Sequence, residues 1–270
     1  MKNPLYIFLV LILLLLTTTI TAQSKKILFV LSAADTLELN NGKKLRQTGV
    51  FLNEFYLPYK AVSDAGFSVD FATPNAVVAT IDNESKDDKY WKNNSEIKTE
   101  ALLFVEKDSA FNNPFSLEKI IENLQDYDGM IVPGGQGLMV DLINEKNVSK
   151  LLKYFAENNK PIGLVCHAPS LILSIPKKEN PFVGYEINSV SPLEEWFIES
   201  FIMKGKPEKR KIAKQLKQMG LIYKSKSPKS NFAVRDRNLV SSQNPYSSEA
   251  FNKLYLEALL EYSQSYPIKN

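Results

Sequence analysis

The stretch KPIGLVCHAP, residues 160–169, decides the fold class. Its core, PIGLV at residues 161–165, is a continuous apolar run, which is typical of a strand buried on both faces of a sheet. Cys166 ends this run. We expect a helix from Ala168 onward, because Pro169 at an early helical position gives up no hydrogen bond. The stretch therefore predicts a buried strand that turns sharply into a helix at a cysteine.

Strand and helix patterns repeat on both sides of this stretch. The expected strands are residues 25–33, 67–72, 127–132, 161–165 and 185–190, with a hairpin of 232–235 and 239–242. The expected helices are residues 50–65, 117–124, 148–158, 168–174, 209–219 and 247–262. Alternating helices and apolar strands are typical of a parallel sheet covered on both faces. The sequence therefore predicts a single doubly wound, mostly parallel α/β domain over residues 23–270.

Two long connections are predicted to carry little regular structure. Residues 35–49 have the composition of a polar loop with an Asn-Asn-Gly turn at residues 40–42. Residues 75–115 have that of a long polar connection with one short helix. Within the helix expected at 50–65, Pro58 predicts a kink or a new turn, because proline lacks the N–H of a helical hydrogen bond.

Residues 1–22 form a separate segment with the pattern of a secretory signal peptide. Lys2 supplies the positive start, residues 5–16 the apolar centre, and Ala22 the small residue at the exit. We expect cleavage after Ala22 and export of the mature protein to the periplasm or the medium. The alternative is an uncleaved membrane anchor, because the apolar run with its threonines approaches the length that spans a bilayer.

Composition excludes several classes of site and partner. The 270 residues contain one Cys and one His, so an internal disulfide and a metal site built on several His or Cys ligands are excluded. The net charge of +3 is too small to indicate nucleic acid by itself, and the Lys-rich residues 204–229 are interpreted as a solvated face. We expect no metal, no cofactor and no nucleic-acid partner.

The position of Cys166 favours a nucleophile. A sharp turn after a strand projects the side chain away from the backbone. A following helix N-terminus would favour the thiolate, and ligands of parallel sheets gather where the strands end. The alternative is an inert buried cysteine.

His167 directly follows Cys166. We do not expect its ring to pair with the sulfur, because adjacent residues do not share a face; a carboxylate or a substrate oxygen is the expected partner. The alternative is a structural histidine. The glycine-rich turn at residues 133–137 would let backbone N–H groups approach a ligand and stabilise an oxyanion.

Four motifs together resemble the ThiJ/PfpI family of the class I glutamine amidotransferase-like superfamily, a flavodoxin-like fold. They are TGVFLNEFYLPY at 48–59, YDGMIVPGGQG at 127–137, KPIGLVCHAP at 160–169 and SSQNPYSS at 241–248. The resemblance is strongest to the branch of glutathione-independent glyoxalases and stress chaperones, and it covers about residues 26–260.

The resemblance implies a role for each matching residue. The nucleophile is Cys166, the acid that contacts its sulfur is Glu54, and His167 is the histidine after the nucleophile. Glu195 in SPLEEW matches the acidic partner of that histidine, with Glu194 as the alternative if the register is shifted by one. The oxyanion and substrate-binding positions are Gly134, Gly135 and Gln136. This chain departs from the branch at Gln136, where a histidine is common; an amide cannot titrate near neutral pH.

The resemblance also implies a function. We expect a cofactor-independent enzyme that converts methylglyoxal or a related dicarbonyl to a 2-hydroxy acid, of the glyoxalase III or D-lactate dehydratase type. Small reactive carbonyls are then the substrates, and a homodimer is expected by analogy with the family. A second hypothesis is a stress-response holding chaperone or a redox-responsive thiol protein. A third, cysteine peptidase or amidase activity, is disfavoured because amidotransferases of this superfold place their histidine far downstream of the cysteine, and no histidine follows His167 in this chain.

Overall fold

A computed structural model describes residues 25–91 and 94–265 of the chain. The strands are β1 (Lys26–Val30), β2 (Thr36–Leu39), β3 (Lys44–Gln47), β4 (Ser68–Thr73), β5 (Phe115–Ser116), β6 (Gly129–Val132), β7 (Ile162–Val165), β8 (Glu186–Ile187), β9 (Ile222–Tyr223), β10 (Ala233–Asp236) and β11 (Leu239–Ser242). The α-helices are α2 (Leu52–Asp64), α3 (Ser95–Lys107), α4 (Ser109–Asn112), α5 (Leu117–Ile121), α6 (Lys146–Glu157), α7 (Pro192–Phe197), α8 (Ile212–Met219) and α9 (Ser248–Ser265).

Short tight helices fill several connections. The 3₁₀ segments are η1 (Pro74–Ala76), η2 (Asn83–Lys86), η3 (Asp88–Tyr90), η4 (Leu124–Asp126), η5 (Gly137–Met139), η6 (Leu142–Asn144), η7 (Ala168–Ser174) and η8 (Lys177–Glu179). A π-helical segment, η9 (Ile198–Ile202), continues α7.

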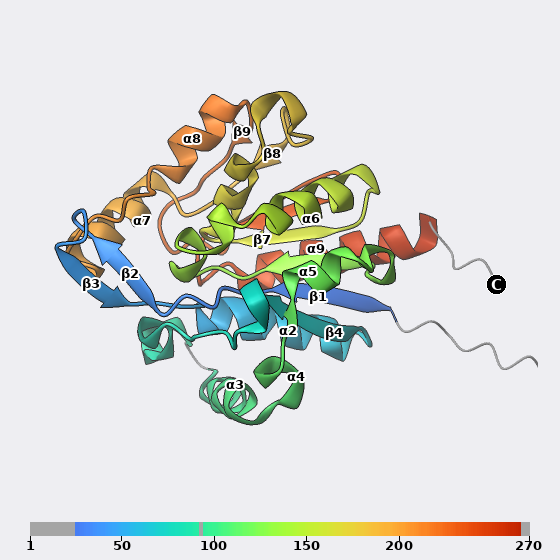
Figure 1. The fold of residues 1–270 in the computed structure, drawn as a ribbon, viewed down its shortest axis with the longest axis horizontal. Helices are drawn as coiled ribbons and strands as arrows, with labels where there is room; N and C mark the ends of the chain where they lie inside the picture. Colours follow the sequence, from blue (N-terminus) through green and yellow to red (C-terminus); the bar gives the residue numbers. More distant parts are fainter. Residues whose placement is uncertain (1–24, 92–93, 266–270) are drawn as a thin grey trace, which may run out of the picture.

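The central sheet has seven strands in the order β10-β11-β7-β6-β1-β4-β5. All neighbours are parallel except β10 and β11, which form an antiparallel hairpin at one edge. Helices α2 and α9 pack together on one face, and α5 and α6 pack together on the other (Figure 1). The predicted doubly wound, mostly parallel α/β fold is confirmed.

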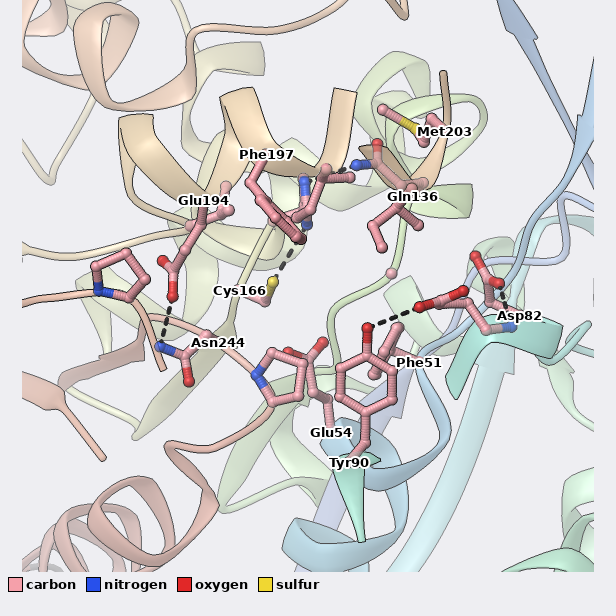
Figure 2. A pocket seen from close by; sticks show the side chains of 18 of the residues that line it. Phe51, Glu54, Asp82, Tyr90, Gln136, Cys166, Glu194, Phe197, Met203 and Asn244 are labelled. Atoms are coloured by element: carbon pink, nitrogen blue, oxygen red, sulfur yellow. Dashed lines mark hydrogen bonds between the residues drawn. The ribbon is translucent and has the colours of Figure 1, made fainter. Parts of the chain in front are cut away.

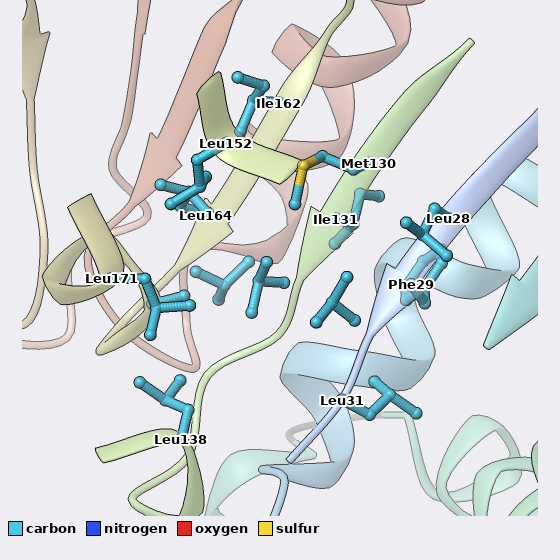
Figure 3. Close-up of a cluster of buried hydrophobic side chains, with 14 of the residues drawn as sticks. Leu28, Phe29, Leu31, Met130, Ile131, Leu138, Leu152, Ile162, Leu164 and Leu171 are labelled. Carbon is cyan, nitrogen blue, oxygen red and sulfur yellow. The ribbon is translucent and has the colours of Figure 1, made fainter. Parts of the chain in front are cut away.

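The position of the strands in the core explains why their sequences are continuous apolar runs. Figure 3 shows side chains of β1, β6 and β7, among them Phe29, Ile131 and Leu164, packed between the two helical layers. All three are fully buried. Each such side chain stabilises the fold by about 1.5–3 kcal/mol relative to an exposed one. Because both faces of these strands are covered, alternation of polar and apolar residues is absent.

Most predicted elements lie within a few residues of the observed ones, but the two long connections differ from expectation. The segment 35–49 is a hairpin, in which β2 pairs with β3 around the predicted Asn-Asn-Gly turn. Within 75–115, the 13-residue helix α3 and the edge strand β5 take the place of one short helix. The hairpin and helix α3 were not predicted because both expose much of their surface, which makes their sequences polar. Helix α2 also runs through Pro58 without a break.

Two further expectations need correction. The segment 185–190 contributes only β8, which pairs with β9 in a separate two-stranded sheet. The helix expected at 168–174 is the 3₁₀ segment η7. The expected helix dipole at Cys166 assumed an α-helix after the cysteine, whereas this segment is a 3₁₀ helix.

The predicted signal peptide, residues 1–22, lies outside the described residues. Among the helices within 25–91 and 94–265, none combines the length and the apolar character needed to cross a bilayer. The β2–β3 hairpin and α7 lie at one end of the molecule, and β1 begins toward the opposite end (Figure 1).

Candidate active site

Cys166 lies at a strained turn at the end of β7. Its φ is +58°, in the left-handed region that a side chain with a Cβ rarely adopts. The backbone is held on both sides, because the Cys166 N–H donates to Ser242 O at 2.8 Å and its carbonyl accepts from Val190 N at 2.9 Å. Neighbouring elements therefore maintain the strain, and the predicted sharp turn is present.

Glu54 reaches this turn from the first turn of α2. The start of the helix is fixed to the glycine-rich loop by a 3.0 Å hydrogen bond from Phe51 N to Gly134 O. A Cβ added at Gly134 would lie 2.1 Å from Glu54 Oε2 and 2.7 Å from the Cβ of Cys166. The carboxyl and the cysteine thus flank the same glycine, and only glycine permits this approach.

The Glu54 carboxyl is 1% exposed, and neither of its oxygens has a hydrogen-bond partner of ordinary geometry among the described residues. Burial raises the pKa of this carboxyl to about 8; the adjacent Cys166 thiol acts in the opposite direction, and the negative charge of Glu194 raises the pKa further. Glu54 is therefore largely protonated at neutral pH and becomes mostly negatively charged only above about pH 8.

The Cys166 thiol is not ionised in the resting site. Burial raises the pKa of the Cys166 thiol well above its ordinary value, and the negative charges of Glu54 and Glu194 raise it further, while the His167 backbone N–H lowers it. The expectation that a helix N-terminus would favour the thiolate is wrong here, because burial, together with the nearby acidic side chains, outweighs the donors near the sulfur. The thiolate must then form by proton transfer during a reaction.

His167 contacts the sulfur directly, which corrects the expectation that adjacent side chains would not meet. Its Nδ1 lies 3.2 Å from the Cys166 Sγ, and its Nε2 lies 2.8 Å from the Gln136 Nε2 (Figure 2). The left-handed turn at Cys166 rotates the chain so that both side chains lie on one side. Burial lowers the pKa of His167 to about 4, so the ring is neutral at physiological pH.

Gln136 fixes the tautomer of that ring. An amide NH₂ group only donates, so a ring Nε2 that meets it must accept, and the ring proton then resides on Nδ1. The Nδ1–H consequently donates toward the Cys166 Sγ. Gln136, the position where this chain departs from the family pattern, thereby makes His167 a neutral donor to sulfur.

Neither glutamate of SPLEEW partners His167. Glu195 accepts from the Lys211 backbone N–H and lines a second, separate cavity, so the expectation that it pairs with His167 is wrong. Glu194 lines the same cavity as Cys166, but its carboxylate accepts from Ser191, Gln243, Asn244 and the Lys229 backbone N–H. The physical reason is that Gln136 and the sulfur already occupy both ring nitrogens of His167.

These groups form the floor of a cavity of about 530 Å³. We define the floor as Glu54, Gln136, Cys166 and His167, all of which line the cavity although each is at most 8% exposed. Gly135 also borders the cavity, whereas Gly134 lies beneath it between Glu54 and Cys166. Of the two predicted oxyanion glycines, only Gly135 therefore presents its backbone to a ligand.

Several residues of the site carried no role in the sequence interpretation. Asn53 is fully buried, and its Nδ2 donates to the carbonyls of Tyr90 and Pro245, both at 3.0 Å, which ties two loops of the cavity to α2. Asn244 holds Glu194 at 2.9 Å. Asn53 lies in the motif TGVFLNE and Asn244 in SSQNPYSS, so the motifs contained both residues but did not indicate what they do.

Within the described residues, no group of three or more His, Cys, Asp or Glu side chains is arranged to hold a metal ion. The chemical groups that meet at the floor are a thiol, a protonatable carboxyl, a neutral imidazole and an amide. This set suits addition to a carbonyl carbon followed by proton transfer.

Comparison with known proteins agrees with this geometry. The sequence model described as ThiJ/PfpI family-like matches residues 45–192, more than half of the chain, and this range includes the whole floor. A curated relative, the protein/nucleic acid deglycase HchA of Escherichia coli, is 26% identical over 239 residues, which are 87% of this chain and 81% of the relative.

Solved structures share the fold. The Rapid Encystment Protein 24 kDa of Francisella tularensis superposes with a TM-score of 0.72 at 23% identity, over 87% of this chain and 99% of that protein. Glyoxalase III of Candida albicans superposes with a TM-score of 0.71 at 22% identity, over 87% of this chain and 97% of that protein. At these identities the likeness establishes the arrangement of elements and no more.

Proposed function

This chain belongs to the ThiJ/PfpI-like family, and we propose that it converts methylglyoxal or a related reactive dicarbonyl to a 2-hydroxy acid without a cofactor. The relative HchA is named a deglycase and the Candida albicans neighbour a glyoxalase III, and both names concern reactive-carbonyl chemistry. The single observation that carries the proposal is the buried Glu54 carboxyl, without an ordinary hydrogen-bond partner among the described residues, beside the Cys166 thiol at the floor of a cavity.

The first step is addition of the thiol to the aldehyde. The ionised form of Glu54, a minority at neutral pH because its pKa is about 8, takes the thiol proton as the Cys166 sulfur bonds to the aldehyde carbon, and the proton passes to the aldehyde oxygen. The product is a hemithioacetal. The His167 Nδ1–H, 3.2 Å from the sulfur, stabilises the developing thiolate as a neutral donor. The Gly135 backbone lines the same cavity as the sulfur, and we expect its N–H to bind the substrate oxygen.

The second step moves a hydrogen between the two carbons. Glu54 removes the proton from the carbon that carries sulfur while the ketone oxygen gains one, which gives an enediol. Return of a proton to the second carbon and loss of one from the first oxygen give a thioester of the 2-hydroxy acid. A carboxyl with a pKa of about 8 both accepts and donates protons near neutral pH, which this step requires.

The third step releases the product. Water attacks the thioester carbon, the carbon–sulfur bond breaks, and the sulfur regains its proton. Methylglyoxal and one water thus become lactic acid, with no external oxidant or reductant; we propose the D enantiomer. We also propose that this chemistry follows export and removal of residues 1–22, and N-terminal sequencing of the protein from its native host would test that.

The experiment uses purified protein, methylglyoxal and no glutathione. Loss of dicarbonyl and formation of lactate are followed by proton NMR, and a chiral assay assigns the enantiomer. We expect D-lactate from the wild type and at least a thousandfold lower rate from Cys166→Ala, since the nucleophile is removed. The absence of lactate from the wild type, or equal rates from both proteins, would refute the proposal.

A further inference from the structure

The cavity above Cys166 is larger than a three-carbon substrate needs. An apolar cavity of about 150 Å³ already accommodates a benzene ring, whereas this cavity encloses about 530 Å³. The excess volume lies between the floor and solvent, where a substituent on the second carbon of a bound dicarbonyl would extend.

Aromatic side chains form two walls of this volume. On the α2 side, the Phe51 and Tyr90 rings pack edge to face at 4.9 Å, and Tyr246 follows at 6.0 Å from Tyr90. On the α7 side, Trp196 and Phe197 line the cavity, and Figure 2 shows Phe197 across the cavity from Tyr90. A flat apolar group would therefore find ring faces and edges on two sides.

Four of the charged side chains that border the cavity above the floor are already paired with each other. Arg46 meets Asp82 at 3.0 Å, and Lys89 meets Glu84 at 2.6 Å. The carboxylate of Glu194 is held by amide and backbone donors, Asn244 among them at 2.9 Å. An apolar substituent leaves these pairs intact, whereas a charged one would have to compete with them.

The α7 wall, formed by Trp196 and Phe197, is held in place by neighbouring residues although its rings are exposed. Trp196 is 54% and Phe197 48% exposed, and both rings pack on Phe201 at 5.6 and 5.1 Å. The segment is anchored to the β2–β3 hairpin through a buried cluster of Leu37, Leu39 and Met203. Because the helix that carries these rings is anchored, the rings form a largely preformed apolar surface on which a ligand can bind.

We propose that these rings form a substrate subsite, and that the preferred substrates are α-oxoaldehydes whose second carbon carries an aromatic ring or an extended apolar chain. This inference rests on the proposed function of the same floor. The aldehyde carbon meets the Cys166 sulfur, and the apolar substituent lies between Tyr90 and the Trp196–Phe197 pair.

The test compares phenylglyoxal with methylglyoxal in glutathione-free assays. The quantity measured is the ratio of their kcat/KM values in a variant relative to the wild type, which cancels the intrinsic reactivity of each aldehyde. In Trp196→Ala/Phe197→Ala we expect this ratio to fall by about tenfold, the scale on which an apolar pocket discriminates. Trp196→Phe, which keeps a ring, should preserve most of the ratio. An unchanged ratio in the double alanine variant would overturn the subsite.

The matched control is Leu260→Ala. Leu260 is 57% exposed on α9 and does not line the cavity, so its loss removes an exposed apolar side chain elsewhere on the surface. We expect both kcat/KM values to stay within about twofold of the wild type. Circular dichroism on every variant confirms the fold before kinetics are compared.

A binding measurement separates failure of the subsite from failure of the proposed function. Acetophenone, an aryl ketone without an aldehyde, is observed by saturation-transfer NMR with the wild type and the double alanine variant. Saturation transfer in the wild type that is lost in the variant supports the subsite even if neither aldehyde is consumed, in which case only the proposed chemistry fails. Equal transfer in both proteins, or none in the wild type, overturns the subsite even if methylglyoxal is consumed.

Discussion

The floor and the α7 wall of one cavity are built in opposite ways. Glu54 and Cys166 on the floor are 1% and 5% exposed and come from segments more than a hundred residues apart. Trp196 and Phe197 on the wall are about half exposed and come from a single helix. The floor depends on burial, which shifts its pKa values, whereas the wall offers only shape and apolar surface. We therefore expect floor substitutions to change rate and protonation, and wall substitutions to change selectivity.

The largest effect that sharpens this comparison is expected for Glu54→Gln. The amide has nearly the same shape but cannot carry a proton, so we expect kcat for methylglyoxal to fall by about 10²–10⁴-fold. Stopped assays of lactate measure it. Wild-type turnover in this variant would mean that the buried carboxyl is only a structural feature of the floor.

The second prediction concerns stability against pH. Glu54 holds its proton up to about pH 8 in the folded protein but titrates near 4.5 when unfolded, so above 4.5 the unfolded state binds fewer protons and stability falls as pH rises toward 8. His167, with its pKa lowered to about 4, acts in the opposite direction, but only below its unfolded value of 6.5. Above pH 6.5 the His167 effect is complete, so we expect Glu54 to dominate the slope up to pH 8.

We expect the free energy of unfolding to fall by up to about 1.4 kcal/mol per pH unit in that window. Urea titrations at pH 6.5, 7.2 and 8 measure the slope. Glu54→Gln should remove most of it and stabilise the protein at pH 8, because no buried charge forms. An equal slope in both proteins would show that other groups cause the pH dependence.

A smaller effect is expected at Gln136. Gln136→Leu removes the donor that fixes the His167 tautomer and leaves the ring Nε2 unpaired, so we expect kcat to fall by about tenfold with KM nearly constant. Gln136→His, which restores a ring N–H donor, should recover activity. A change in KM alone would place Gln136 in substrate binding instead.

The smallest effect is expected for Glu195→Gln, outside both floor and wall. Its carboxylate accepts from the Lys211 backbone N–H and lines the second cavity, so kcat/KM should stay within about twofold of the wild type. A loss of a hundredfold in the same assay would restore Glu195 as a partner of the reaction.

The fold was predictable from the sequence because the buried strands are continuous apolar runs and the turn after PIGLV ends at a cysteine. The hairpin β2–β3 and helix α3 were missed because they are half exposed and polar. At the site, the motifs located Cys166, Glu54 and His167, but they did not reveal how the side chains meet. The contact of His167 with sulfur depends on a left-handed backbone at Cys166, which residue type does not predict.

The partners of the glutamates illustrate the same limit. The family resemblance implied a role for Glu195, with Glu194 as the alternative, yet the helix turns the two carboxylates toward different cavities. A raised pKa for a buried glutamate near a thiol could be expected, but the sequence did not show that Glu54 is completely buried or that Glu194, 140 positions away in the chain, adds to the shift.

The central claim is that Glu54 carries a proton at neutral pH beside the Cys166 thiol. The most direct measurement is a pH titration of the side-chain carboxyl carbons by ¹³C NMR on glutamate-labelled protein, with the Glu54 signal assigned by its absence in Glu54→Gln. We predict a midpoint at about pH 8. A midpoint near the ordinary value of 4.5 would contradict the account.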